Sequence, residues 1–245
     1  MPVYSLVEMI LQSVRPLTTE VLLYLISLPN IARHRDAFVS VLSSDEMKRM
    51  QRFCSEKLQL NFALTRGSLR HILASHLGCS PAKVPLQYTA LGKPFIEGAD
   101  LQFNLSHSGD FGVVAISSKD LVGVDIERCE SSNKPYYEIA KRFFTVTEFK
   151  ALLHCPIRDG EALFYYLWTQ KEAFLKAIGE GLGFGLNCFE VSTDLNEPTV
   201  GSIQDERYRH RIWSSRSVMS PPGYCTTCTK ENEISTVRWI DFVLS

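Results

Sequence analysis

Hydrophobic residues recur along this chain with two spacings, and each spacing predicts its own kind of element. A helical spacing fills two long segments, residues 62–77 and residues 161–178, and each segment ends at a glycine. Shorter helices are expected at residues 43–53, 136–143 and 145–153, of which the first and last begin at a Ser or Thr cap. Alternating positions or short apolar runs predict strands at residues 21–27, 84–89, 101–106, 111–116, 122–127, 189–192, 211–214 and 237–243.

This order of elements predicts an α+β fold, because strands cluster before and after long helices instead of alternating regularly with them. Two lobes, each a small, mostly antiparallel sheet packed on one long helix, would account for it. A chain of 245 residues is long enough to bury the core of one large domain or of two such lobes.

Composition narrows the classes of partner. The net charge of −1 gives no sign of nucleic-acid or anionic-membrane binding, which usually leaves an excess of basic residues. The first residues, 1–4, lack the basic start of a signal peptide, and the longest apolar run, residues 21–28, is too short to span a bilayer. We therefore expect a cytoplasmic protein without a membrane partner.

The chain has seven cysteines, an odd number that favours reduced thiols in a cytoplasmic protein. Two of them, Cys225 and Cys228, form a single CxxC. Without a second pair this is a weak signal for zinc or redox chemistry, and a plain pair in a surface loop is the favoured interpretation.

A charged strand is the first chemical signal. In Gly123-Val124-Asp125-Ile126-Glu127 the alternation places Asp125 and Glu127 on one face, where two carboxylates repel each other unless a cation neutralises them. Magnesium does this well, because it prefers one or two carboxylates together with phosphate oxygens. Taken alone, the pair is equally consistent with a solvated edge strand.

The second signal is on the last long helix, where Phe164, Trp168, Glu172 and Lys176 follow one another at i, i+4. This spacing places a carboxylate and an ammonium group one turn apart on the same helix face as two aromatic rings. Each charge taken alone is more often a solvated helix residue. The turn at residues 92–94 and the strand end at residues 104–108, which carries Ser106 and His107, add side chains suited to anions.

Together these segments resemble the 4′-phosphopantetheinyl transferases, and among them the larger, pseudodimeric Sfp-type group. The matching residues are, in order, Arg49 and Phe53 with the helix from Arg66 to Leu77, Gly92-Lys93-Pro94, Phe103 to Ser108, Val122 to Glu127, Lys141-Arg142-Phe143-Phe144, Glu148, Trp168 to Lys176, and Gly179 to Leu182. Departures occur at Phe62, where some relatives have a small hydroxyl residue, and at Lys57, where many have arginine.

The resemblance implies two similar lobes related by a pseudo-twofold axis, with coenzyme A bound in the cleft between them. The N-terminal lobe, residues 1–120, would bind the adenine and 3′-phosphate end of coenzyme A. The C-terminal lobe, residues 121–245, would hold the metal and bind the carrier. Because one chain supplies both halves of the cleft, the resemblance also implies a monomer.

The family roles carry over by position. Asp125, Glu127 and Glu172 would hold Mg²⁺ against the pyrophosphate of coenzyme A. Further contacts to coenzyme A would come from Arg49 at the 3′-phosphate and from Lys93, Pro94, Ser106, His107, Asp125 and Lys171. The catalytic residues would be Glu172, Lys176 and Glu127.

The implied reaction transfers the phosphopantetheine arm to a serine of an apo acyl, peptidyl or polyketide carrier protein and releases 3′,5′-ADP. Glu172, or Glu127 through a water molecule, would accept the serine proton, and Lys176 would offset charge on the leaving group. Two other classes stay open on the residues alone. One is a magnesium-dependent phosphohydrolase that acts on a nucleotide pyrophosphate; the other is a non-catalytic module that binds carrier or nucleotide.

Overall fold

The fold is given by a computed structural model, which describes residues 19–129 and 136–244. Helices and strands combine in an α+β arrangement, as the order of elements predicts. The expectation about a leader rests on residues 1–4, which lie outside the described part of the chain. Across the described residues no helix is both long and apolar enough to cross a membrane.

The first sheet has the strand order β11-β1-β5-β4. Its strands are β1 (Glu20–Ser27), β4 (Gln102–Ser108), β5 (Phe111–Ser117) and β11 (Thr236–Asp241). β1 pairs with β5 and β5 with β4 in antiparallel register, whereas β11 runs parallel to β1. The last strand of the chain therefore belongs to the sheet that the N-terminal residues build, although it falls in the range expected for the C-terminal lobe.

The second sheet has three antiparallel strands in the order β6-β10-β9. They are β6 (Val122–Arg128), β10 (Tyr224–Glu231) and β9 (Trp213–Val218). Hairpins β2 (Gln87–Tyr88) with β3 (Pro94–Phe95) and β7 (Phe189–Val191) with β8 (Val200–Ile203) lie apart from both sheets. The strand expected at residues 84–89 is thus shorter than predicted.

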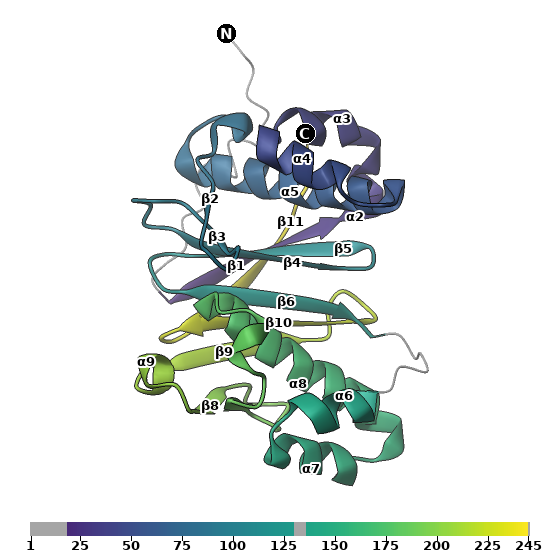
Figure 1. The fold of residues 1–245 in the computed structure, drawn as a ribbon, viewed down its shortest axis with the longest axis vertical. Coiled ribbons are helices and arrows are strands. Elements are labelled where there is room, and N and C mark those ends of the chain that lie inside the picture. The colour runs from purple at the N-terminus through teal and green to yellow at the C-terminus, as the bar shows by residue number, and fades with distance from the viewer. Residues whose placement is uncertain (1–18, 130–135, 245) are drawn as a thin grey trace.

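Four layers follow from these pairings: helices, the first sheet, the second sheet and helices again (Figure 1). The alternation along β1 shows why. Leu22, Tyr24 and Ile26 face one cluster with helix α5 (Glu56–Leu77), whereas Val21 and Leu23 face a second cluster shared with β6 and β10. Both faces of the first sheet are therefore apolar, and the two sheets pack face to face.

The outer layers are two long helices with shorter ones beside them. Over the first sheet lies α5, with α2 (Leu28–Ile31), α3 (Arg35–Ser40) and α4 (Ser44–Gln51). Against the second sheet lies α8 (Ile157–Ile178), with α6 (Tyr136–Phe143), α7 (Val146–His154) and, farther along, α9 (Glu206–Arg209). Three short 3₁₀ turns occupy Ala32–His34, Pro81–Lys83 and Leu182–Phe184.

The helix ends agree with the sequence signals. Ser43 and Thr145 each accept a hydrogen bond from the backbone of a glutamate three residues on, and that glutamate bonds back to the cap, which makes two complete capping boxes. Both long helices begin several residues earlier than predicted and end at left-handed glycines, Gly78 and Gly179.

The prediction that Cys225 and Cys228 form a plain pair in a surface loop is wrong. Cys225 and Cys228 lie in β10, a strand that the sequence reading missed, and both are buried. Burial raises the pKa of each thiol to about 12, so neither is a ready thiolate for zinc or redox chemistry. All seven cysteines of the chain are free, as expected for reduced thiols.

Candidate active site at the seam between the sheets

Polar side chains join the two sheets where their edge strands meet. Asn104, Ser106 and Ser108 project from one face of β4 and accept hydrogen bonds from the backbone amides of Val124, Ile126 and Arg128 in β6, at 3.0, 3.3 and 3.1 Å. Side chains thus replace the backbone ladder between β4 and β6. The alternating polar residues of the predicted strand end are therefore first of all a structural seam.

Asp125 lies at this seam as a buried acid. Its Oδ1 accepts from the Ser106 hydroxyl at 2.9 Å and from Lys176 Nζ at 2.6 Å, and Lys176 also donates to Ser106 Oγ at 2.8 Å. Gly123, Asp125 and Glu127 share the face of β6 that lies against α8. The solvated-edge interpretation of the strand is therefore wrong for Asp125, which is 2% exposed.

The other two predicted carboxylates are close by. Ser108 donates to Glu127 Oε2 at 3.0 Å. The pKa of Glu172 is raised to about 7, chiefly by burial, then by the negative charge of Asp125, with Glu127 adding to it and Lys176 opposing it. The structure therefore brings Asp125, Glu127 and Glu172 into electrostatic reach of one another, with Lys176 beside them.

The donor set fits a hard divalent cation. Among the described residues, Asp125 Oδ2 is buried and has no hydrogen-bond partner, which is a costly state for a carboxylate oxygen. Carboxylates and phosphate oxygens are the ligands that magnesium prefers. Within residues 19–129 and 136–244, however, no three His, Cys, Asp or Glu side chains are arranged as a ready metal cluster, and Lys176 occupies Oδ1.

Lys93 joins the two halves of the molecule at the C-terminal end of α8. Its Nζ donates to the carbonyl of Ala177 at 2.5 Å, and burial lowers its pKa to about 8. The neighbouring Pro94 begins β3 and pairs with Tyr88 of β2. The turn at residues 92–94 is therefore held against the last turn of α8, which also carries Lys176.

His107 and Arg49 lie on the α5 side of the seam. His107 is exposed, on the face of β4 opposite Ser106. Its pKa is lowered by loss of surrounding water and then by the charges of Lys176 and Arg66, while Asp125 opposes the shift. Arg49, in α4, has its guanidinium 5.7 Å from the ring centroid of Phe62.

Lys171 is the predicted residue that the structure does not bring to the site. Its side chain is fully buried, and Nζ donates to the carbonyls of Leu186 and Phe189 and lies 2.8 Å from Glu148 Oε1. One step along a helix turns a side chain by about 100°, so Lys171 and its neighbour Glu172 face different parts of the protein. The assignment of Lys171 to coenzyme A phosphates is therefore corrected: it stabilises the C-terminal core.

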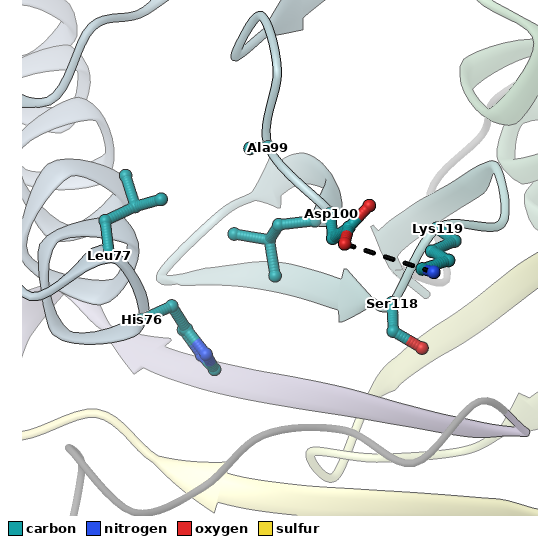
Figure 2. A pocket seen from close by; sticks show the side chains of 7 residues that line it. His76, Leu77, Ala99, Asp100, Ser118 and Lys119 are labelled. Carbon is teal, nitrogen blue, oxygen red and sulfur yellow. Dashed lines mark ion pairs between the residues drawn. The ribbon is translucent and has the colours of Figure 1, made fainter.

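A separate hollow of about 400 Å³ lies at the far end of β4 (Figure 2). His76, Asp100 and Lys119 are among the residues around it, and Lys119 pairs with Asp100 at 3.9 Å with both side chains largely exposed. Such a pair contributes little, about 0–1 kcal/mol. Leu101, which lines the hollow, directly precedes β4, whereas Ser106 lies toward the other end of this strand, so the hollow is distinct from the seam.

Comparison with known proteins decides the family. Residues 121–229 match the profile of the 4′-phosphopantetheinyl transferase superfamily, and residues 30–119 match that of the 4′-phosphopantetheinyl transferase N-terminal region. The chain is 34% identical over 186 residues to the 4′-phosphopantetheinyl transferase HetI of Nostoc sp., which covers 74% of this chain and 78% of HetI. It belongs to the 4′-phosphopantetheinyl transferases of the Sfp type.

Other relatives of this transferase agree. The slr0495 protein of Synechocystis sp., named a putative 4′-phosphopantetheinyl transferase, is 38% identical over 82% of this chain and 80% of its own length. Sfp of Bacillus subtilis is 30% identical over 66% of this chain and 71% of its own. A solved structure of Thermotoga maritima holo-[acyl-carrier-protein] synthase covers 46% of this chain and 64% of its own, at 20% identity and a TM-score of 0.33.

One charged residue of this transferase, Arg66, lies in the helix that matches the family but has no predicted role at the site. Arg66 lies in α5, is 8% exposed, and stands close enough to His107 to shift its pKa. A signal was present, because Arg66 and Arg70 follow at i, i+4 within an otherwise apolar stretch of the helix. Lysine and arginine are seldom fully buried unless they are paired, so such a placement indicates a bound anion or a buried acid.

Proposed function

We propose that this chain transfers 4′-phosphopantetheine from coenzyme A to a serine of an apo carrier protein, releases 3′,5′-ADP, and depends on Mg²⁺. The observation that carries the proposal is the buried Asp125 at the seam, with one oxygen held by Lys176 and Ser106 and the other without a hydrogen-bond partner among the described residues. A carboxylate in this state is suited to a cation that arrives together with its phosphate ligand.

Asp125, Glu127 and Glu172 would hold the metal. Bound there, Mg²⁺ would offset negative charge on the pyrophosphate oxygens. Opening of the Lys176–Asp125 contact would release Asp125 Oδ1 for the ligand and leave the ammonium facing the leaving group. Lys93, Pro94, Ser106 and His107 stay assigned to the coenzyme A side of the site, where Lys93 already lies against the last turn of α8.

The carrier serine attacks the β-phosphorus of coenzyme A, and the bond from that phosphorus to the oxygen of 3′,5′-ADP breaks. Glu172 accepts the serine proton, directly or after a water molecule held by Glu127. Without a metal, burial and the neighbouring carboxylates raise the pKa of Glu172 to about 7; a bound cation would lower this pKa and favour the ionised form that accepts a proton. Lys176 offsets the charge that develops on departing 3′,5′-ADP.

We further propose that the two halves are related by a pseudo-twofold axis, with the cleft at the seam. Several features support it: α5 and α8 have the same length of 22 residues, each follows a helix with a capping box, and each packs on its own sheet. The two family profiles also meet near residue 120. The lobes would be residues 1–120 and 121–245, apart from β11, which pairs with β1.

A basic and apolar surface on α6 is the proposed contact for the carrier. Phe143 is 39% exposed beside Lys141 and Arg142, whereas Phe144 is buried, so only one of the adjacent rings faces the core. Basic residues around an exposed ring would suit an acidic carrier helix. We place this reaction in the cytoplasm, with the enzyme acting as a monomer.

The test is mass spectrometry of an apo carrier incubated with the protein, coenzyme A and Mg²⁺. The expected result is a carrier heavier by one phosphopantetheine group, with no product when a chelator removes the metal. Asp125→Asn should remove several kcal/mol of transition-state stabilisation, so the rate of transfer should fall by more than about 100-fold.

Lys119→Gln is the matched control, since this exposed residue lies at the hollow of Figure 2 and should leave the rate unchanged. Release of free phosphopantetheine without modification of any carrier would instead indicate a phosphohydrolase. Binding of coenzyme A without turnover would indicate a non-catalytic module.

A further inference from the structure

Arg66 has donors without acceptors. It lies in the middle of α5, and its Nε and Nη1 are buried without a hydrogen-bond partner anywhere in residues 19–129 and 136–244. Desolvation lowers the pKa of this guanidinium; Tyr88 and Glu46 oppose the shift, and the charges of Arg49 and Arg70 add to it. A buried charged group left without partners is costly, so its retention indicates an acceptor that comes from outside the described chain.

The nearest carboxylate does not fill this role. Glu46 Oε1 lies 3.8 Å from Arg66 Nε, too far for a hydrogen bond. The Glu46 carboxylate is already occupied by Arg70 Nε at 2.6 Å, the backbone amide of Ser43 at 2.8 Å and the Tyr88 hydroxyl at 3.3 Å. One carboxylate therefore faces two buried arginines, and a positive charge is left over.

The surroundings of Arg66 limit what the acceptor can be. Its guanidinium carbon lies 5.8 Å from the ring centroids of both Phe62 and Tyr88. Aromatic rings beside a guanidinium favour an acceptor that approaches in the plane of the guanidinium, where two N–H groups point in the same direction. A phosphate group presents several acceptor oxygens and matches this fork better than a single carbonyl does.

The surplus charge is directed toward the seam. Arg66 and Lys176, one from each long helix, both lie within electrostatic reach of the exposed His107. Arg49 adds a further positive charge over the same Phe62 ring that Arg66 approaches. An anionic group bound beside His107 would therefore lie within electrostatic reach of both Arg66 and Lys176.

We propose that the unpartnered N–H groups of Arg66 bind the 3′-phosphate of coenzyme A, so that Arg66 distinguishes coenzyme A from dephospho-coenzyme A. This inference rests on the proposed function and adds a specificity-determining residue to it. Arg49, assigned to the same phosphate from sequence, would add longer-range attraction from its place over Phe62.

Calorimetry with two ligands tests the proposal. Wild-type protein should bind coenzyme A more tightly than dephospho-coenzyme A, by roughly 10- to 150-fold for a charge-assisted bond. In Arg66→Gln this ratio should fall close to one, because affinity for coenzyme A is lost while affinity for dephospho-coenzyme A stays within about threefold of wild type.

Arg70→Gln is the matched control. Arg70 lies one turn away on α5 and is equally buried, but it donates to Glu46, Pro81 and Val84. Its replacement should lower the unfolding temperature and keep the wild-type ratio of affinities. If Arg66→Gln does not fold, Arg66→Lys should give an intermediate ratio, since it keeps the charge and loses the fork.

The outcomes separate this inference from the proposed function. An unchanged ratio in Arg66→Gln or Arg66→Lys, in a protein that still modifies carrier, would overturn the role of Arg66 alone. Equal weakening of both ligands would show a structural role and would overturn it as well. Failure of wild-type protein to bind either ligand would overturn the proposed function together with the inference.

Discussion

The helices α5 and α8 each carry a buried cation that pairs with a capping-box glutamate, but the charges balance in only one of the two halves. In each half a capping-box glutamate, Glu46 or Glu148, is buried against a cation on the long helix, and Arg70 and Lys171 occupy the same place within their helices. In the C-terminal half Lys171 is fully satisfied by one carboxylate and two carbonyls. In the N-terminal half a second arginine, Arg66, is added without a second acid.

This difference separates a structural element from a binding element. A satisfied buried pair fixes α7 against α8 and leaves nothing for a ligand. An excess cation weakens the free protein and is offset only when an anion binds, which is how functional sites commonly depart from the most stable arrangement. In the proposed site the C-terminal half would therefore provide the rigid support for Asp125 and Glu172, and the N-terminal half would provide charge for the ligand.

The largest expected effect tests how closely each helix lies on its sheet. A Cβ at Gly123 of β6 would come 2.0 Å from the carbonyl oxygen of Ala173, a backbone atom of α8. Gly123→Ala should therefore destabilise the protein by at least about 4 kcal/mol and abolish transfer, because α8 must move away from Asp125. Urea unfolding monitored by circular dichroism measures it.

Gly112→Ala in β5 is the control, since the nearest atoms to its Cβ would be the Thr65 methyl of α5 at 3.4 Å and atoms of Ile26 and Ser106 at 3.6 Å, which are ordinary contact distances. It should change stability by less than about 1 kcal/mol. Wild-type stability in Gly123→Ala would mean that α8 can withdraw from its sheet as freely as α5.

The next effect concerns the two buried cation clusters. Lys171→Met and Arg70→Met should each cost about 3–5 kcal/mol of unfolding free energy, because each leaves a buried glutamate without its main partner. Arg66→Met should cost less than about 1 kcal/mol, since its Nε and Nη1 form no hydrogen bond within the described chain. Denaturant midpoints of the three variants decide it, and an equal loss in Arg66→Met would place Arg66 with the structural pairs.

The third effect is a pH dependence of the unfolding free energy, which arises from Glu172 on α8. Its pKa is about 7 in the folded protein and about 4.3 in an unfolded chain, so the folded state binds the extra proton between these values. Unfolding free energy should therefore fall as the pH rises from about 4 through 7, by up to roughly 3 kcal/mol without metal. Urea unfolding with a chelator at each pH measures this slope, and Glu172→Gln should flatten it; parallel slopes for the two proteins would contradict the burial of this acid.

The smallest effect concerns the surface of α6 in the C-terminal half. Lys141→Glu combined with Arg142→Glu should raise the KM for carrier, most strongly at low salt, because screening weakens the attraction of exposed charges. Coenzyme A affinity and stability should change little, within about 0.5 kcal/mol for stability. Steady-state kinetics at two ionic strengths measure the effect, and an unchanged KM at both would leave Phe143 as an ordinary exposed ring.

Much of the site could be predicted from the sequence, because its spacing is local. Alternation in β6 places Asp125 and Glu127 on one face, and helical spacing places Glu172 and Lys176 one turn apart. The same local rules gave the capping boxes and the glycine ends of the long helices. The α+β class and the family followed from the order of these segments.

Tertiary structure decided which charges face the site. Lys171 and Glu172 are neighbours in sequence, yet only packing of α8 between β6 and the segment at residues 186–189 showed that Lys171 belongs to the core. The strand β10 was missed because its many threonines and cysteines carry no clear apolar alternation, although both of its faces are buried.

The sequence alone determined the fold class and the family and predicted most of the acidic and basic residues of the proposed site, since all of these depend on residue types at short, fixed spacings. Only the tertiary structure decided that β11 completes the first sheet, that the polar side chains of β4 hold β6, and that Arg66 is buried with unused donors. The physical reason is that pairing and burial depend on residues far apart in the chain. No local spacing reports whether such a distant partner is present.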